Sequence, residues 1–190
     1  MAVRAEASKR VQDAIVVATV SIVAREGVAA VTHRRLAAEA GVSLSSTTWH
    51  FAKKTDILMA ALRWTAAHEV ARIADIADRM GDAGFDPAAW SEGLAEWLIG
   101  QVTTEREIAV ALYRLQIELL GIPGAQDVHR EWGRGLRALG ERATEHSEAV
   151  DIRLVVAALD GLRLSVILSG EEDVEWLRTA VRRQLKSLLG

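Results

Sequence analysis

Apolar residues recur along most of this chain at intervals of three and four, which is the spacing of one face of an α-helix. In residues 8–26, for example, Ile15, Ala18 and Ile22 follow this spacing before Gly27 ends the segment. No stretch alternates apolar and polar residues with the period of two that a half-buried strand requires. The pattern therefore predicts an all-α protein.

Glycines, prolines and capping residues divide the chain into about nine predicted helices. Asp86-Pro87 is a strong start signal, because a capping side chain precedes a proline at the first helical position, and Thr104 to Glu107 has the spacing of a capping box. The expected helices cover about residues 8–26, 33–40, 44–50, 54–80, 87–102, 104–120, 125–146, 147–169 and 171–188. We predict an N-terminal domain of three helices over residues 1–53 and a larger helical domain over residues 54–190.

The apolar run of residues 14–24 has two interpretations. Three basic residues precede it, as they do in a secretory signal. Against a signal, Gln12 and Asp13 stand where the run begins, no clear A-x-A cleavage site follows, and the spacing is helical. These features favour a buried first helix in a cytoplasmic protein. No segment of the sequence is long and apolar enough to span a bilayer.

Composition excludes several classes of function. The chain has no cysteine, which rules out a disulfide framework, a thiolate zinc site and a cysteine nucleophile. The five histidines are scattered without a metal-binding spacing, and neither a phosphate loop nor a Gly-x-Ser-x-Gly elbow is present. We therefore expect no enzymatic activity, no metal and no cofactor.

Charge is distributed unevenly along the chain. Residues 1–55 hold eight Lys and Arg against four Asp and Glu, a balance of +4 that leaves −7 for the remainder, since the net charge is −3. A basic N-terminal segment on an acidic body suits a protein whose N-terminus alone meets a polyanion.

Residues 31–54 have the features of a helix-turn-helix. Gly41 permits a left-handed turn between two short helices, Val42 fills the angle between them, and Ser43 caps the second helix. That second helix, residues 44–50, is mostly short and polar without an acidic side chain, and Lys53 and Lys54 follow it. Such a helix suits the major groove of DNA. The alternative is an ordinary helical hairpin with a solvated polar face.

The stretch GVAAVTHRRLAAEAGVSLSSTTWHFAKKTDIL, residues 27–58, resembles the signature of the TetR family of bacterial transcriptional regulators. The shared elements are a Gly-Val-x-x-x-Thr opening, then Arg-x-Leu-Ala, Ala-Gly-Val-Ser, His-Phe and Lys-x-x-x-Leu, at fixed spacing without a gap. The resemblance implies a helix-turn-helix DNA-binding domain joined to a helical domain that binds a ligand and forms a homodimer.

Carried over by position, the resemblance assigns contacts with double-stranded operator DNA to a set of N-terminal residues. Arg34 would reach bases, and Thr32 would cap its helix and touch a phosphate. The full set is Thr32, Arg34, Leu44, Ser45, Ser46, Thr48, Trp49, His50 and Lys54. Phe51 and Thr47 would point into the core. The family most often has Leu-Tyr where this chain has Thr47-Thr48, which leaves the operator sequence open.

The last two predicted helices carry the candidate dimer interface. Small residues recur every four positions in the first of them, and an apolar seam follows in the second. The candidates are Leu154, Ala157, Gly161, Ser165, Val174, Leu177, Val181 and Leu185. Packing of these two helices within one chain is the alternative, whereas the resemblance implies a four-helix bundle between two protomers.

Large aromatic residues with a few polar neighbours indicate an apolar or aromatic effector. The candidate contacts are Trp64, His68, Trp90, Leu94, Trp97, Tyr113, Gln116 and Trp132, although the tryptophans alternatively fill the core. We therefore predict a ligand-responsive transcriptional repressor that releases a palindromic operator when a small effector binds. A helical protein-interaction module without DNA binding is the second hypothesis, and the choice between repressor and activator stays open.

Overall fold

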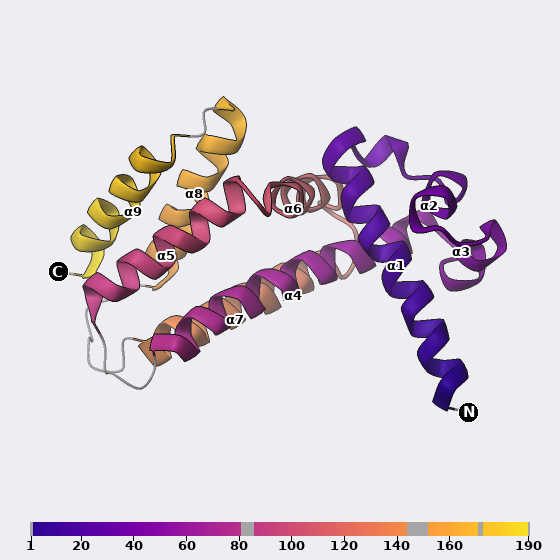
Figure 1. The fold of residues 1–190 in the computed structure, drawn as a ribbon, viewed down its shortest axis with the longest axis horizontal. Coiled ribbons are helices and arrows are strands. Elements are labelled where there is room, and N and C mark those ends of the chain that lie inside the picture. Colours follow the sequence, from indigo (N-terminus) through magenta and orange to yellow (C-terminus); the bar gives the residue numbers. More distant parts are fainter. Residues whose placement is uncertain (1, 81–85, 144–151, 171–172, 190) are drawn as a thin grey trace. The chain divides into compact units, whose positions relative to one another are not determined.

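The computed structural model describes residues 2–80, 86–143, 152–170 and 173–189 (Figure 1). Its elements are α1 (Ala2–Glu26), the short 3-10 helix η1 (Val28–Ala30), α2 (His33–Ala40), α3 (Leu44–His50), α4 (Lys54–Met80), α5 (Pro87–Val102), α6 (Arg106–Glu118), α7 (Ala125–Ala143), α8 (Ile152–Ser169) and α9 (Val174–Leu189). No strand occurs in these ranges, so the all-α prediction is confirmed. None of the described helices combines the length and the apolarity needed to cross a membrane.

The ends of α2 and α3 follow the predicted capping chemistry. The Thr32 hydroxyl accepts a hydrogen bond from the backbone amide of Arg35 at 3.2 Å, and the Ser43 hydroxyl accepts one from the amide of Ser46 at 3.0 Å. Each bond satisfies an amide that has no partner inside its own helix. Gly41 ends α2 with φ of +64°, a conformation that costs glycine little because it has no Cβ.

Two other helix starts differ from each other in how well the sequence predicted them. The Asp86 carboxylate accepts from the amide of Ala88 at 2.9 Å, so α5 begins as expected. By contrast α1 begins at Ala2, ahead of the predicted start, and an ion pair between Glu6 and Arg10 at 2.9 Å supports this additional part of the helix. The predicted end at residue 146 and the predicted starts at residues 147 and 171 lie outside the described residues.

The predicted capping box at Thr104 is wrong. The Thr104 hydroxyl donates to the carbonyl of Gly100 in α5 at 3.4 Å, and α6 begins only at Arg106. Glu107, the expected partner in the box, accepts instead from the Ser21 hydroxyl of α1 at 3.2 Å. The Glu107 carboxylate, which the local sequence pattern predicted as a helix cap, thus forms a contact between α6 and α1.

The first of two compact units comprises residues 1–66 and 107–129. Its core is built on α1, where Ile15, Ile22 and Val23 are fully buried, and α1 packs against α2 and α3 (Figure 1). The guanidinium of Arg114 on α6 donates to the carbonyl of Val23 at 2.7 Å and to that of Ala24 at 2.9 Å. A cation at the C-terminal end of α1 is favourable because that end carries partial negative charge. The apolar run of residues 14–24 is thus part of a core helix.

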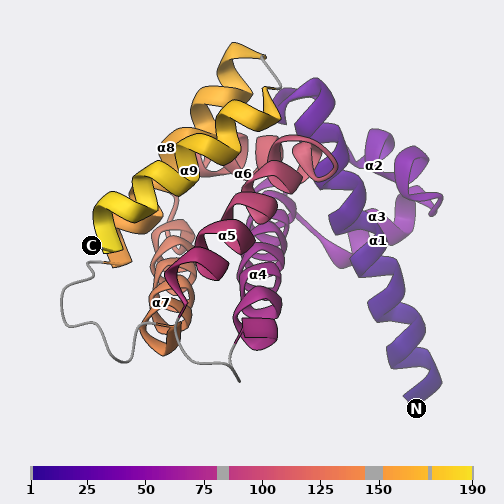
Figure 2. The same cartoon turned by 60° about the vertical axis from the view of Figure 1, so that its left-hand side comes forward.

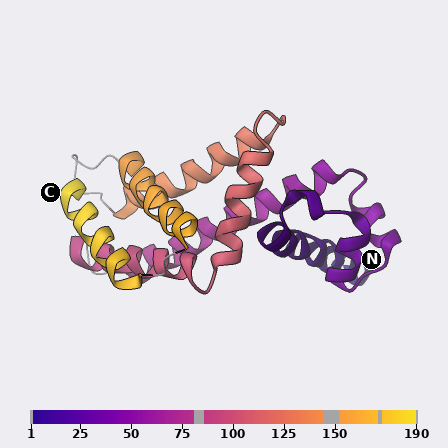
Figure 3. The same cartoon turned by 90° about the horizontal axis from the view of Figure 1, so that it is seen from above.

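The second unit comprises residues 67–106 and 130–190. In it α5 packs against α8 and α9, and α8 also packs against α9 (Figures 2 and 3). The C-terminal half of α4 lies beside α7, where a Cβ built on Gly135 would stand 3.1 Å from the side chain of Val70. Each unit therefore draws on two separate stretches of chain, and the predicted boundary between residues 53 and 54 remains a prediction.

Candidate nucleic-acid interface and buried polar core

The exposed surface of α3 carries the side chains that the sequence proposed for DNA contact. Leu44 is 53% exposed and Trp49 is 74% exposed. Of the nine candidates, Thr32, Arg34, Leu44, Ser45, Thr48, Trp49 and Lys54 are exposed, while Ser46 and His50 are half-buried. No acidic residue lies within α3, so this surface repels no phosphate.

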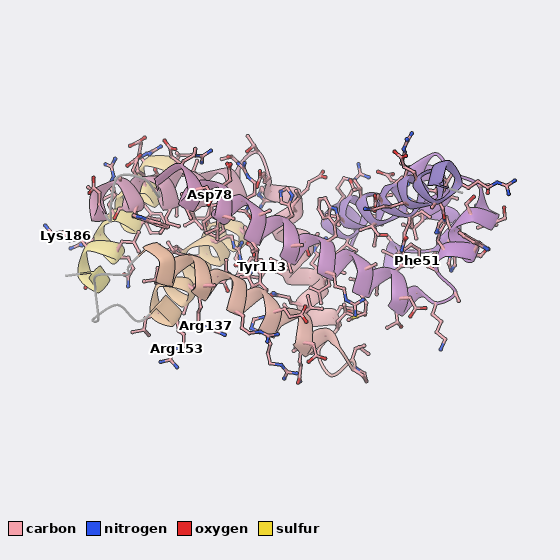
Figure 4. All side chains as sticks on the ribbon, turned by 90° about the horizontal axis from the view of Figure 1, so that it is seen from below. Phe51, Asp78, Tyr113, Arg137, Arg153 and Lys186 are labelled. Atoms are coloured by element: carbon pink, nitrogen blue, oxygen red, sulfur yellow. The ribbon has the colours of Figure 1, made fainter. Side chains whose placement is uncertain are left out.

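The opposite side of α3 attaches it to its own unit. Thr47 is fully buried and Phe51 is 5% exposed, as predicted, and Phe51 stands at the end of α3 shortly before α4 begins (Figure 4). The Thr47 hydroxyl donates to the carbonyl of Leu44 at 2.8 Å and lies 3.3 Å from Nδ1 of His33 on α2. The polar residue that replaces the family's usual leucine thus links α2 to α3. The contact of His33 could not be predicted from the sequence, because no local pattern pairs His33 with Thr47.

Hydroxyl groups at the start of α3 form a small hydrogen-bonded cluster. The Ser43 oxygen lies 2.8 Å from that of Ser45 and 2.7 Å from that of Ser46. One turn later the Thr48 hydroxyl donates to the carbonyl of Ser45 at 3.1 Å. These local bonds orient short side chains on the exposed helix surface, and such hydroxyls can exchange partners for phosphate or base atoms.

An ion-pair network between α1 and α2 fixes the helix that precedes the turn. Arg35 donates to Glu39 at 2.7 Å and to Glu26 at 2.8 Å, and Arg25 also pairs with Glu39. Hydrogen bonds from Arg35 and then Arg25 lower the pKa of the Glu39 carboxyl, and bonds to Glu26 and Glu39 raise the pKa of Arg35. The spacing of Arg35 and Glu39 by four residues was the available sequence signal. The neighbouring residue, Arg34, is exposed.

The eight residues proposed to contact an effector divide between the two units. Trp64, Tyr113 and Gln116 are half-buried and belong to the first unit (Tyr113 is labelled in Figure 4). The second unit holds the others, of which Trp90, Leu94, Trp97 and Trp132 are buried and His68 is half-buried. The sequence pattern therefore found buried aromatic residues, while their role as ligand contacts stays a prediction.

The second unit also contains a buried polar cluster that was not predicted from the sequence. Arg163 on α8 is 1% exposed and forms an ion pair with Glu69 on α4, which is 2% exposed. The Glu69 carboxylate also accepts from the indole N–H of Trp132 on α7 at 2.6 Å. Desolvation lowers the pKa of Arg163 to about 10, so its guanidinium stays charged at neutral pH.

Further contacts tie this cluster to α5. Arg163 donates to the side-chain oxygen of Gln101 at 3.4 Å and to Asp160 at 2.5 Å, and it lies over the Trp97 ring, 5.7 Å from its centroid. Gln101 in turn donates to Glu105 at 2.7 Å. Four helices, α4, α5, α7 and α8, thus meet at one buried cation and one buried carboxylate.

A periodic signal for this cluster was present in the sequence. In α4, Glu69 falls in register with buried Leu62 and Ile73, and in α8, Arg163 falls in register with buried Leu159 and Val166. A charged residue on an apolar stripe is a candidate for a buried ion pair. No group of three or more metal-binding side chains occurs in the described residues.

The dimer candidates separate into exposed and buried sets. Leu154, Ala157, Gly161 and Ser165 are exposed along α8, and Val174 on α9 is half-buried. The other three, Leu177, Val181 and Leu185, are at most 1% exposed within one chain, where α9 packs against α5 and α8. For these three, the structure places the side chains inside the protomer, so they offer no surface to a second copy.

Comparison with known proteins identifies both parts of the chain. The model of bacterial regulatory proteins of the tetR family matches residues 15–61, and that of the tetracyclin repressor-like C-terminal domain matches residues 85–190. A member of the TetR family from Streptomyces coelicolor is 33% identical, with 92% of this chain and 97% of that chain covered and a TM-score of 0.72.

Another solved structure, the multidrug binding protein EbrR complexed with ethidium, is 33% identical over 92% of this chain and 97% of that chain, with a TM-score of 0.68. The same protein has been solved with proflavin and with malachite green. A search of curated proteins returned no match. The two family models and the similarity across nearly the whole chain agree, and this chain belongs to the TetR family of DNA-binding helix-turn-helix regulators.

Proposed function

We propose that this protein is a cytoplasmic transcriptional repressor whose α3 enters the major groove of a palindromic operator and leaves it when a small apolar or aromatic effector binds. The observation that carries the proposal is the surface of α3, where Leu44 and Trp49 are exposed among hydroxyl groups and no carboxylate is present. Exposed apolar and hydroxyl side chains on a capped helix match the base edges of the major groove. Arg34 and Lys54 supply positive charge beside it.

The exposed stripe of α8 supports a homodimer. Leu154 is 55% exposed and Leu168 is 76% exposed, and exposed small residues lie between them at helical spacing. A Cβ built on Gly161 would meet no atom within 4 Å, so a second helix can approach closely there. A two-fold dimer would present two copies of α3 to two half-sites separated by one DNA turn or a multiple of it.

The effector would act by binding one conformation of the protein more tightly than another. Binding to the second unit releases DNA only if the ligand prefers the conformation in which the two α3 helices do not fit successive grooves, because equal affinity for both conformers shifts nothing. Buried Trp90, Trp97 and Trp132 in that unit favour an aromatic ligand, and so do the ethidium and proflavin complexes of a protein 32–33% identical to this one.

The test is selection of genomic DNA fragments by the purified protein at physiological salt, followed by fluorescence anisotropy on the enriched sequence. One palindromic site should emerge, and Arg34→Ala combined with Trp49→Ala should abolish its enrichment, since base-edge contacts carry sequence preference.

A salt titration separates phosphate contact from base contact. Lys54→Ala should reduce the slope of log affinity against log salt by about one unit, because each released counterion contributes nearly one. Lys186→Ala, at an exposed position on α9 (Figure 4), is the matched control and should leave the slope unchanged. A wild-type protein that binds no duplex at low salt would instead favour the protein-interaction module.

A further inference from the structure

The environment of Arg163 is unusual for a charged side chain. Arg163 and Glu69 are the only charged residues that are buried within the described part of the chain. Their pairing joins α8 to α4 across more than ninety positions of sequence. A buried ion pair of this kind gives little net stability compared with apolar residues of similar size, so its presence calls for another explanation.

The Arg163 guanidinium has an aromatic ring and a buried carboxylate as neighbours. The guanidinium carbon lies over the Trp97 ring, 5.7 Å from its centroid, at a distance where the ring attracts a cation. The guanidinium also pairs with the Glu69 carboxylate, which accepts a hydrogen bond from the Trp132 indole N–H at 2.6 Å. An aromatic face and an oriented buried carboxylate are the two groups that recognise a planar cationic ring system.

We propose that Arg163 occupies an internal site for a flat aromatic cation, and that an effector of this class binds by displacing the guanidinium from Glu69 and Trp97. The inference rests on the proposed function, since it names the class of effector and the contact that the effector replaces. Exchange of one cation for another leaves Glu69 paired. An uncharged ligand in the same place would leave the Glu69 carboxylate without a counter-charge, and an anionic ligand would be repelled by it.

The displaced arginine has another partner available. Asp160 lies one turn earlier on α8, already accepts from Arg163 at 2.5 Å, and has a side chain that is 38% exposed. A rotation of the Arg163 side chain toward Asp160 would therefore keep the charge paired and return it toward water. Burial lowers the pKa of Arg163 to about 10, because removal from water disfavours the charged form.

The indole N–H of Trp97 is a buried hydrogen-bond donor without an acceptor in the described residues. Trp97 as a whole is 8% exposed. A buried donor without an acceptor is destabilising, and a bound molecule that supplies an acceptor removes that cost.

The experiment titrates the full chain with ethidium and follows the fluorescence of the dye. Arg163→Met removes the internal cation but keeps a long flexible side chain, and it should tighten ethidium binding by about tenfold or more because no displacement is needed. Glu69→Gln should weaken ethidium binding by at least about tenfold, since the counter-charge is lost. Arg72→Met is the matched control, because Arg72 pairs with Glu105 in the same unit but is 48% exposed, and it should leave the affinity unchanged.

A second measurement needs no variant and stays informative if Arg163→Met does not fold. Phenanthridine shares the ring system of ethidium but is uncharged at neutral pH, and wild-type protein should bind it at least about tenfold more weakly. Equal affinity for the two molecules would overturn the proposal. Arg163→Met protein that is folded by circular dichroism and binds ethidium as weakly as Glu69→Gln would also overturn it.

Parallel measurements on operator DNA distinguish this inference from the proposed function. Wild-type protein that binds a palindromic site but shows no affinity for ethidium or proflavin contradicts the cation site and leaves the repressor intact. Protein that binds ethidium with the expected response to Arg163→Met, yet binds no DNA, contradicts the repressor and supports the cation site.

Discussion

At the scale of single residues, the Glu39 carboxyl should make the stability of the first unit depend on pH. Glu39 accepts from Arg35 at 2.7 Å and also pairs with Arg25, and these bonds hold its pKa below the ordinary value of 4.5. A carboxyl whose pKa is lower when folded stabilises the native state fully above its unfolded value, and that contribution disappears as the pH falls through the folded pKa. The contact between α1 and α2 should therefore weaken in acid.

Glu39→Gln tests this effect. The variant should melt below the wild type at neutral pH, and the difference should shrink as the pH falls through the lowered pKa of Glu39, because the wild-type carboxyl then becomes protonated as well. Thermal unfolding followed by circular dichroism across that range is the measurement. Glu118→Gln, an exposed carboxyl at the end of α6, is the control. A difference in melting temperature that stays constant with pH would show that the ion pairs do not stabilise the unit.

At the scale of elements, the turn between α2 and α3 determines how the recognition helix is presented. Gly41 adopts φ of +64°, and a Cβ there would meet no atom within 4 Å, so the constraint on this position comes from its backbone conformation alone. Gly41→Ala should destabilise the protein by about 1–2 kcal/mol, the cost of the left-handed conformation for a residue with a Cβ. Urea denaturation gives this difference in the free energy of unfolding.

Gly133→Ala is a suitable comparison for Gly41→Ala. Gly133 lies within α7, and its added Cβ would stand at an ordinary 3.5 Å from the flexible end of Arg137. This substitution should be neutral or stabilising by up to about 1 kcal/mol, because alanine favours a helix over glycine. Equal effects of both substitutions would mean that φ at Gly41 is not the controlling feature.

At the scale of the whole molecule, the proposed homodimer would assemble through the exposed stripe of α8. In a two-fold interface the same patch meets itself, so a new charge at one position appears on both sides. Leu154→Glu combined with Leu168→Glu should therefore yield a monomer in sedimentation velocity experiments, while the fold by circular dichroism is unchanged. Leu120→Glu, at a position 73% exposed after α6, is the control and should leave the oligomeric state unaltered. A double variant that sediments like the wild type would exclude this face as the dimer contact.

Local chemistry was enough to predict most helix ends and the exposed surface of α3. Ser43, Gly41 and Asp86 act within four residues of their own positions, so their hydrogen bonds and dihedral angles depend on neighbours that the sequence lists directly. The same holds for the alternation in α3 between buried Thr47 and exposed Trp49, which follows from the helical period.

Only the tertiary structure decided which distant residues meet. The Glu107 carboxylate was predicted to cap its own helix, but it accepts a hydrogen bond from Ser21 of α1. Leu185 faces the interior of its own chain, although its spacing fitted a dimer interface equally well. Glu69 and Arg163 stood on apolar stripes, yet no local rule pairs residues so far apart. The period of a helix tells which side chains share a face, whereas the partner of that face depends on how helices pack against one another.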